Sequence, residues 1–395
     1  MSDRQMTQDS PSPAPTSSRG VDPDARPTTR AVHVGLAPDP TTGAVAPSIS
    51  LSTTFERTSE GALRGAFGYG RDGHPNRLAL EQAVASLEGG EVAACFASGL
   101  AAIDAVLRAL PAGARVVAPS DVYHGTRQLL VEHHPSLETT FVDQTDLAAL
   151  RAALAGGAEL LMIETPSNPA LDVTDILLAV GLAHAAGALC AVDNTWMTPI
   201  FQRPIELGAD LVIHSSTKYF GGHSDVSGGA VVAAREDEMF ARIRAVQTHA
   251  GASAAPFDCW LIRRGLQTLD CRLRAQTQTA GEIARHFHGH PRLEAVLYPG
   301  LEDHPGHHTS IRQASGFGAM LSLCVRGDRA ETTAVAGRCR LFTRATSLGG
   351  VESLIEQRVL VEGDDSPTPP NLLRLSIGLE HVDDLVGDLE RALGG

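Results

Sequence analysis

The chain has 395 residues, of which 43% are hydrophobic and 20% charged, the composition of a globular protein long enough for two or three folding units. Its 32 basic and 46 acidic side chains give a formal net charge of −14, which argues against a nucleic-acid or anionic-membrane partner, because both attract clustered positive charge. No apolar stretch approaches the ~20 residues needed to cross a bilayer.

The chain begins with a segment unlike the rest. Residues 1–29 are rich in Pro, Ser, Thr, Asp and Arg and contain no apolar segment, so we expect a disordered tail rather than a secretory signal. The first clear helix signal lies at Pro75, and Gly89 closes the same helical pattern. A second helix is predicted after Ser98, because serine is a typical N-cap residue.

Short apolar segments alternate with helical patterns between residues 74 and 256. Continuous apolar strands are typical of a parallel sheet that helices cover on both faces. We therefore predict that residues 74–256 form an α/β domain with a mostly parallel sheet. Its strands are expected at Glu91–Ala97, Ala114–Ala118, Thr139–Val142, Leu160–Glu164, Leu189–Asp193, Asp210–His214 and Gly229–Ala233.

The pattern changes near Pro256. A long helical segment is expected from residue 257 to residue 287, and apolar strands are expected at Ala319–Val325 and Leu372–Ile377. The segment Glu362–Pro370 contains Gly, Asp, Ser and three Pro residues, which predicts a loop. Residues 257–395 are therefore predicted to form a smaller α+β domain.

Lysine occurs only once in this chain. Of the 32 Lys and Arg residues, 31 are Arg, and the single lysine is Lys218, in a polar segment that follows an apolar strand. An arginine supplies positive charge but keeps its proton, so it cannot act as an amine nucleophile. The plainer alternative is a leftover surface lysine, but the position at a strand end favours a functional amine.

Polar residues gather where the predicted strands end. In open α/β sheets, ligands bind outside the carboxyl ends of the strands. The backbone N–H groups at the start of a helix can hold an anion there, and nearby hydroxyls can add donors. The candidates are Ser98, Gly99 and Leu100 at a helix start, Glu164 and Asn168 after one strand, Asp193 at the end of another, and Ser215 and Thr217 just before Lys218.

An amine, a carboxylate on an apolar strand and a phosphate-type cradle are together what pyridoxal 5′-phosphate requires. The amine binds the cofactor covalently, and the carboxylate keeps the pyridine nitrogen protonated so that the ring can act as an electron sink. Each feature alone is more often structural. Their occurrence with the single lysine predicts that Lys218 is the amine and Asp193 the acid.

The sequence resembles the pyridoxal-phosphate-dependent Cys/Met metabolism family of trans-sulfuration enzymes. The resemblance runs from about Val32 to Leu393, and its motifs occur in the same order along the chain. They are Tyr69-Gly70-Arg71, Ala97-Ser98-Gly99-Leu100-Ala101-Ala102, Glu164-Thr165-Pro166-Ser167-Asn168-Pro169, Val192-Asp193-Asn194-Thr195, Ser215-Ser216-Thr217-Lys218-Tyr219, Ser347-Leu348-Gly349-Gly350-Val351-Glu352-Ser353-Leu354 and Leu373-Arg374-Leu375-Ser376-Ile377-Gly378.

The resemblance implies a fold and a set of site residues. The fold is that of the type I, aspartate aminotransferase-like transferases. Lys218 and Tyr123 are the implied catalytic residues, with Tyr123 stacked on the cofactor ring, and Ser347 and Arg374 are the implied substrate-binding residues. The implied cofactor-binding residues are Tyr69, Arg71, Ser98, Gly99, Leu100, Tyr123, Asn168, Asp193, Thr195, Ser215, Thr217 and Lys218.

The resemblance also implies an assembly. In the family, the residues matching Tyr69 and Arg71 reach the phosphate of the neighbouring subunit. Residues 30–73 are therefore expected to form an arm that contacts a second copy, within a homodimer or homotetramer. The partners expected are that second copy and a small amino-acid substrate.

The family motifs favour γ-chemistry on cystathionine or an O-acyl homoserine, as in cystathionine γ-synthases and γ-lyases. The run Ser347–Ile355 resembles that branch most, although Thr346 stands where its members often carry Glu. Gly125 stands where methionine γ-lyases tend to have Cys, and residues 357–370 depart from the usual family segment. Cystathionine β-lyase, methionine γ-lyase and a catalytically silent cofactor-binding scaffold remain alternatives.

Two further features bear on chemistry and location. The histidines His304, His307 and His308 cluster in a Pro- and Gly-containing segment, but no carboxylate or Cys completes a metal set, so a surface loop without metal is favoured. The six cysteines are scattered, mostly in apolar runs, which suits reduced thiols in a cytoplasmic protein.

Overall fold

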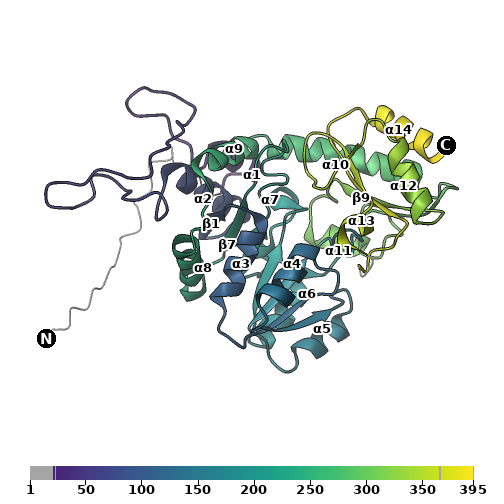
Figure 1. Cartoon of the computed structure of the whole chain (residues 1–395), viewed down its shortest axis with the longest axis horizontal. Helices are drawn as coiled ribbons and strands as arrows, with labels where there is room; N and C mark the ends of the chain where they lie inside the picture. The colour runs from purple at the N-terminus through teal and green to yellow at the C-terminus, as the bar shows by residue number, and fades with distance from the viewer. Residues whose placement is uncertain (1–20, 23, 364–365, 395) are drawn as a thin grey trace.

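The structure is a computed structural model that describes residues 21–22, 24–363 and 366–394 (Figure 1). Most of the predicted tail therefore lies outside the described residues. Its last three residues, however, form the first turn of helix α1 (Pro27–His33). Arg263 explains why this short helix forms, because its guanidinium donates to the carbonyl oxygens of Ala31 at 2.8 Å and Val34 at 2.6 Å and so satisfies the helix end.

The large sheet has seven strands in the order β1-β7-β6-β5-β4-β2-β3. All of its strand pairs are parallel except those of β7, which is antiparallel to both of its neighbours. The predicted mostly parallel α/β sheet is therefore confirmed. Its strands are β1 (Val92–Phe96), β2 (Arg115–Pro119), β3 (Glu138–Val142), β4 (Leu160–Glu164), β5 (Leu189–Asp193), β6 (Leu211–His214) and β7 (Gly229–Ala233).

Helices cover both faces of this sheet, as Figure 1 shows. Successive strand residues point to opposite faces, so Val116 packs with residues of α3 and α8 while Val117 packs with residues of α5 and α6. The helical segments here are α2 (Pro75–Glu88), α3 (Gly99–Ala109), α4 (His124–Gln128), η1 (Leu129–His133), α5 (Leu147–Leu154), α6 (Ile176–Ala185), α7 (Thr198–Phe201), η2 (Pro204–Leu207) and α8 (Glu238–His249).

A second, five-stranded sheet lies in the C-terminal part of the chain, in the order β10-β11-β12-β9-β8. Its strand pairs are antiparallel except β10 with β11. Its elements are β8 (Leu293–Leu297), α11 (His307–Gln313), β9 (Met320–Val325), α12 (Arg329–Arg338), β10 (Thr343–Arg344), β11 (Leu354–Glu356), α13 (Val359–Glu362), β12 (Leu372–Ser376) and α14 (Val382–Gly394).

The single helix predicted for residues 257–287 is wrong. The structure has two helices, α9 (Pro256–Leu266) and α10 (Leu269–Phe287), with a break at Thr268. Arg272 stabilises the break, because its guanidinium donates to the carbonyl oxygen of Gly265 at 2.8 Å and its Nε donates to the Thr268 hydroxyl at 3.1 Å. These side-chain bonds replace the backbone bonds that a continuous helix would make.

The segment from residue 34 to residue 73 forms isolated bridges but no regular strand or helix. In Figure 1 it extends away from the body as long purple loops. The indole N–H of Trp260, on helix α9, holds this segment to the body by donating to the Pro47 carbonyl at 2.9 Å. Apolar side chains of the segment face solvent, with Val45 81% and Leu51 72% exposed. Among the described helices, none combines the length and apolar character that a membrane span needs.

Candidate active site

A cavity lies at the carboxyl ends of strands β4, β5 and β6, between the large sheet and the C-terminal sheet. Twelve of the fourteen site residues predicted from the sequence line it: Ser98, Gly99, Leu100, Tyr123, Asn168, Asp193, Thr195, Ser215, Thr217, Lys218, Ser347 and Arg374. Glu164, named from the sequence as a strand-end candidate without an assigned role, also lines it, and the remaining lining residues were not predicted: Ile103, Trp196, Thr346, Leu348 and Arg358.

Lys218 lies just beyond the end of β6, where its amine enters the cavity. Its Nζ donates a hydrogen bond to the Ser347 hydroxyl at 3.0 Å. Burial, and after it the charge of Arg374, lower the pKa of Lys218 to about 8, because both disfavour the ammonium form. The neutral amine, which can accept a proton, is therefore far more populated near neutral pH than in an ordinary lysine, although the ammonium form still predominates there.

The predicted anion cradle lies at the start of α3. Ser98 is the N-cap, and its side chain accepts from the Ala101 N–H at 3.1 Å, so the N–H groups of Gly99 and Leu100 have no carbonyl partner within the helix. Residue 99 must be glycine, because a Cβ there would lie 2.8 Å from Cβ of Ser215. The first helical turn and the Ser215 hydroxyl therefore converge on one point.

Two hydroxyls fix the loop that carries Lys218. The Thr195 hydroxyl accepts from the Ser215 N–H at 2.9 Å. The Thr217 hydroxyl donates to the Gly228 carbonyl at 3.2 Å and accepts from the Gly228 N–H at 3.0 Å. In this structure Thr217 thus secures the loop, whereas the sequence predicted that its hydroxyl contacts a bound phosphate.

Two carboxylates lie side by side at the strand ends. Glu164 and Asp193 are register partners in the parallel pair β4–β5. Burial raises the pKa of Asp193, while hydrogen bonds from Thr195 and the nearby charge of His214 oppose that rise. Burial and the neighbouring Asp193 raise the pKa of Glu164 well above its usual value. Glu164 also accepts from the Tyr123 N–H at 2.8 Å, which positions Tyr123 over the cavity.

A buried contact between Glu88 and His214 lies behind Asp193. Glu88, with no exposed surface, contacts Nε2 of His214 at 2.5 Å and accepts from the Asn194 amide at 2.8 Å. Asn194 follows Asp193 directly in the sequence, and its backbone N–H donates to the Ile213 carbonyl at 3.0 Å. This polar cluster therefore supports the end of β5 from inside the core.

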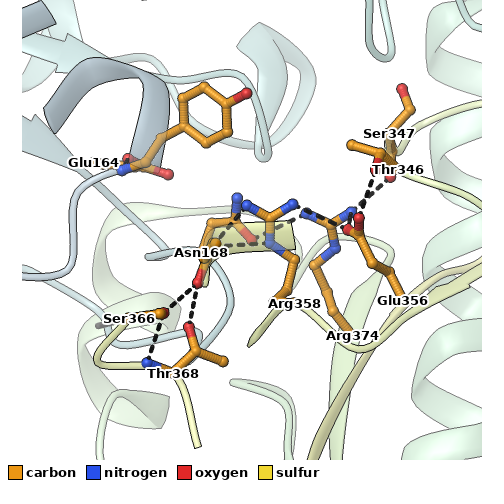
Figure 2. A network of polar contacts seen from close by, with 11 residues as sticks. Glu164, Asn168, Thr346, Ser347, Glu356, Arg358, Ser366, Thr368 and Arg374 are labelled. Carbon is orange, nitrogen blue, oxygen red and sulfur yellow. Dashed lines mark hydrogen bonds and ion pairs between the residues drawn. The ribbon is translucent and has the colours of Figure 1, made fainter. Parts of the chain in front are cut away.

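Arg374 lies on β12 and lines the cavity. Figure 2 shows its polar contacts. Its guanidinium donates to the Asn168 side chain at 3.1 Å, the Ser347 carbonyl at 2.9 Å and the Glu356 carboxylate at 2.6 Å. Its buried Nε has no partner among the described residues. A buried, unsatisfied guanidinium N–H beside a cavity is a donor available to a carboxylate ligand.

Ser347 connects the amine to the guanidinium. Its hydroxyl accepts from Lys218 and its carbonyl accepts from Arg374. Its φ of 116° is a backbone conformation that non-glycine residues rarely adopt. Such strain is found at functional sites, where the surrounding structure enforces it.

Glu356 and Arg358 extend the Arg374 network (Figure 2). Glu356 accepts from Arg374, from Arg358 at 3.1 Å and from the Thr346 hydroxyl at 2.6 Å. The sequence contained no local sign of Glu356 or Arg358, and Arg358 lies in the segment that departs from the family motifs. Thr346 had a weak sign, since it is a polar neighbour of the predicted Ser347.

Tyr69 and Arg71 do not reach the cavity of their own chain. Both lie on the extended 34–73 segment, where the Arg71 guanidinium stacks over the Tyr69 ring at 5.2 Å. Tyr69 is 46% exposed. Their predicted contact with a neighbouring subunit stays a prediction.

The clustered histidines have structural contacts. His304 is buried rather than on a surface loop, and its Nδ1 accepts from the Gly306 N–H at 3.0 Å. His307 bonds to the Pro299 carbonyl at 2.8 Å and stacks on Phe317. Within the described residues, no group of three or more His, Cys, Asp or Glu side chains is arranged to hold a metal ion.

Comparison with known proteins gives one consistent family. Residues 28–394 match the family described as Cys/Met metabolism PLP-dependent enzyme. The chain is 45% identical over 373 residues to cystathionine γ-synthase of Mycobacterium leprae, covering 92% of this chain and 96% of the relative. It is 41% identical over 375 residues to cystathionine γ-lyase of Dictyostelium discoideum, covering 92% and 97%.

Solved structures agree with this comparison. Cystathionine γ-synthase from Xanthomonas oryzae pv. oryzae in complex with cystathionine superposes on this chain with a TM-score of 0.90. The two are 41% identical in sequence, and the match covers 94% of this chain and 98% of the other.

Proposed function

This chain belongs to the Cys/Met metabolism PLP-dependent enzymes, and on that premise we propose that it catalyses γ-elimination or γ-replacement on cystathionine or an O-acyl homoserine. It is an enzyme that uses pyridoxal 5′-phosphate, as the sequence predicted. The observation that carries the proposal is the placement of an amine and a carboxylate clamp on either side of one residue, Ser347.

The cavity fits this cofactor. Lys218 is the only lysine in the chain, and its amine would bind the cofactor aldehyde. The first turn of α3 at Gly99 and the Ser215 hydroxyl would hold the phosphate. Asp193 would pair with the pyridine nitrogen, and Tyr123 would cover the ring. The bound cofactor supplies an electron sink for charge that develops at Cα of the substrate.

The residues of the chain provide the remaining chemistry. Arg374 would bind the substrate α-carboxylate, with its unpartnered Nε adding a donor. Because Ser347 separates Arg374 from Lys218, a carboxylate bound at Arg374 brings the adjacent Cα near the Lys218 amine. Once the substrate amino group has replaced it on the cofactor, that amine, whose pKa is lowered to about 8, would accept the Cα proton.

Two observations favour chemistry at Cγ over chemistry at Cβ. The γ-synthase relative is 45% identical to this chain, against 40% for a relative named cystathionine β-lyase, and the run Ser347–Ile355 resembles the γ-branch. Cystathionine β-lyase and methionine γ-lyase are the competing activities. We also infer that the enzyme works in the cytoplasm, since its cysteines are free thiols.

Product analysis tests the proposal. The purified holoenzyme is incubated with cystathionine, and separately with O-acyl homoserine plus cysteine. We expect 2-oxobutanoate from cystathionine, or cystathionine from the second mixture. Pyruvate from cystathionine would instead indicate β-elimination. The absence of any product with these substrates, together with turnover of methionine, would assign the methionine γ-lyase activity.

We further propose that two copies of the chain assemble through the 34–73 segment. The segment exposes apolar side chains and carries Tyr69 and Arg71, which do not reach their own cavity. In a dimer these residues would complete the phosphate site of the partner. Deletion of residues 34–73 should therefore separate the copies, so that light scattering gives the mass of a single shortened chain. It should also lower the affinity for the cofactor.

A further inference from the structure

We propose that Arg358 is a positioning residue that controls how strongly Arg374 binds the substrate α-carboxylate, by competing for Glu356. This inference rests on the proposed function, in which Arg374 is the carboxylate clamp. It assigns a role to a residue in the segment that departs from the family motifs.

The competition is visible at a single oxygen atom. Oε2 of Glu356 accepts from Arg374 at 2.6 Å and from Arg358 at 3.1 Å (Figure 2). The register of β11 and β12 places Glu356 directly opposite Arg374. In the absence of substrate, Glu356 therefore occupies part of the guanidinium that the substrate carboxylate needs.

A second carboxylate balances Arg358 from the other side. Glu362 accepts from Nε of Arg358 at 3.0 Å and from its terminal nitrogen at 2.6 Å. The hydroxyls of Ser366 and Thr368 also donate to Glu362 and hold it in place. Two guanidinium groups and two carboxylates thus form one cluster of zero net charge.

The cluster is buried, so its charge balance has strong effects. The side chains of Arg358, Arg374, Glu356 and Glu362 are each at most 8% exposed. The pKa of Arg374 is lowered to about 10, mainly by burial; the charge of Glu356 opposes this shift and that of Arg358 adds to it. Charge interactions inside a protein are weakly screened, so removing one charge changes the attraction for an incoming carboxylate.

The proposal predicts opposite effects at the two ends of the cluster. Arg358→Gln leaves two carboxylates facing Arg374, so Glu356 binds Arg374 alone and the substrate carboxylate binds more weakly. Glu362→Gln frees Arg358 to attract Glu356, so Arg374 binds substrate more tightly. Because Glu362 acts through Arg358, the double variant should have the weakened affinity of Arg358→Gln, without the gain that Glu362→Gln gives alone. A purely structural role would weaken binding in every variant.

The experiment measures KM and kcat of the holoenzyme for an O-acyl homoserine. It also measures the dissociation constant of a non-reacting amino acid, and of its carboxamide, from the absorbance of the bound cofactor. For Arg358→Gln we expect an increase of about tenfold or more in KM, with kcat changed by less than about twofold. For Glu362→Gln we expect a decrease in KM. Binding of the carboxamide should not change, because it lacks the charge that Arg374 recognises.

Arg338 provides a matched control. It shares Oε1 of Glu331 with Arg292, at 3.2 and 2.7 Å, and so forms the same Arg–Glu–Arg arrangement outside the cavity. Arg338→Gln should leave KM unchanged. Arg358→Lys keeps the charge, so its KM should lie between those of the wild type and Arg358→Gln. This variant also tests the proposal if Arg358→Gln does not fold.

The outcomes separate this inference from the proposed function. If the wild type binds and converts the substrate but Arg358→Gln keeps the wild-type KM, the inference alone is wrong. Equal changes of KM in the same direction for Arg358→Gln and Glu362→Gln would also overturn it. If the wild-type enzyme converts no amino acid and binds none, the proposed function fails together with the inference.

Discussion

Replacing Lys218 with methionine should stabilise the cofactor-free protein, because the native fold buries a charge there that the unfolded chain leaves in water. The native structure lowers the pKa of this amine from 10.5 to about 8, mainly by burial. A difference of this size corresponds to about 3 kcal/mol of folding free energy at pH 7. Losing the hydrogen bond to Ser347 offsets about 1 kcal/mol, so we expect a net gain of about 2 kcal/mol.

The pH dependence gives this prediction a definite sign. Below pH 8 the amine is charged in both states, so the folded protein carries the full cost of burying it. Between pH 8 and 10.5 the unfolded chain binds a proton that the folded protein does not, so the stability of the wild type rises with pH. The advantage of the Lys218→Met variant should therefore shrink by about 1.4 kcal/mol between pH 7 and pH 9.

Urea denaturation at pH 7 and pH 9 measures the gain in stability and its change with pH. The cofactor-free proteins are used because bound cofactor would add stability of its own. The Ser347→Ala variant is the control, because it removes the hydrogen bond and keeps the amine. A Lys218→Met variant less stable than the wild type at pH 7, or an advantage that does not change with pH, would refute the reasoning.

Three further predictions concern other parts of the site. His214→Phe removes a hydrogen-bond partner of the buried Glu88 side chain and should lower the free energy of unfolding by about 1–3 kcal/mol in urea denaturation. An unchanged free energy of unfolding would contradict a stabilising role for the contact. Gly99→Ala places a Cβ 2.8 Å from Cβ of Ser215 and should weaken the binding of pyridoxal phosphate. The absorbance of the cofactor that stays bound during dialysis measures this effect, and unchanged retention would argue against the cradle. Arg374→Lys cannot form the planar fork and should raise KM for the amino acid about tenfold or more in steady-state assays, whereas an unchanged KM would exclude Arg374 as the clamp.

Local patterns were enough to predict much of the fold. The apolar strands of the large sheet, the N-cap at Ser98 and the closing Gly89 all lie where the sequence placed them. These signals act over a few residues, so they can be read without knowing the rest of the structure. The helix predicted across Thr268 was wrong because Arg272, acting from the next turn, stabilises a break that the apolar period does not show.

The short strands of the C-terminal sheet were harder to predict. Strands β10 and β11 contain two and three residues, too few to show a period. They are strands because β12 pairs with β11 and brings Glu356 opposite Arg374. The polar network around the carboxylate clamp depends on this register, so it too was absent from the sequence analysis.

The sequence by itself predicted the cofactor that this protein uses, because only one side chain in 395 residues offers a primary amine and its position after a strand end marks the proposed cofactor site. The tertiary structure decided which groups surround that amine and Arg374. Strand register sets Glu164 beside Asp193 and Glu356 against Arg374, and burial shifts the pKa values of the groups. Both effects arise between residues distant in the chain, where no local pattern records which side chains will meet.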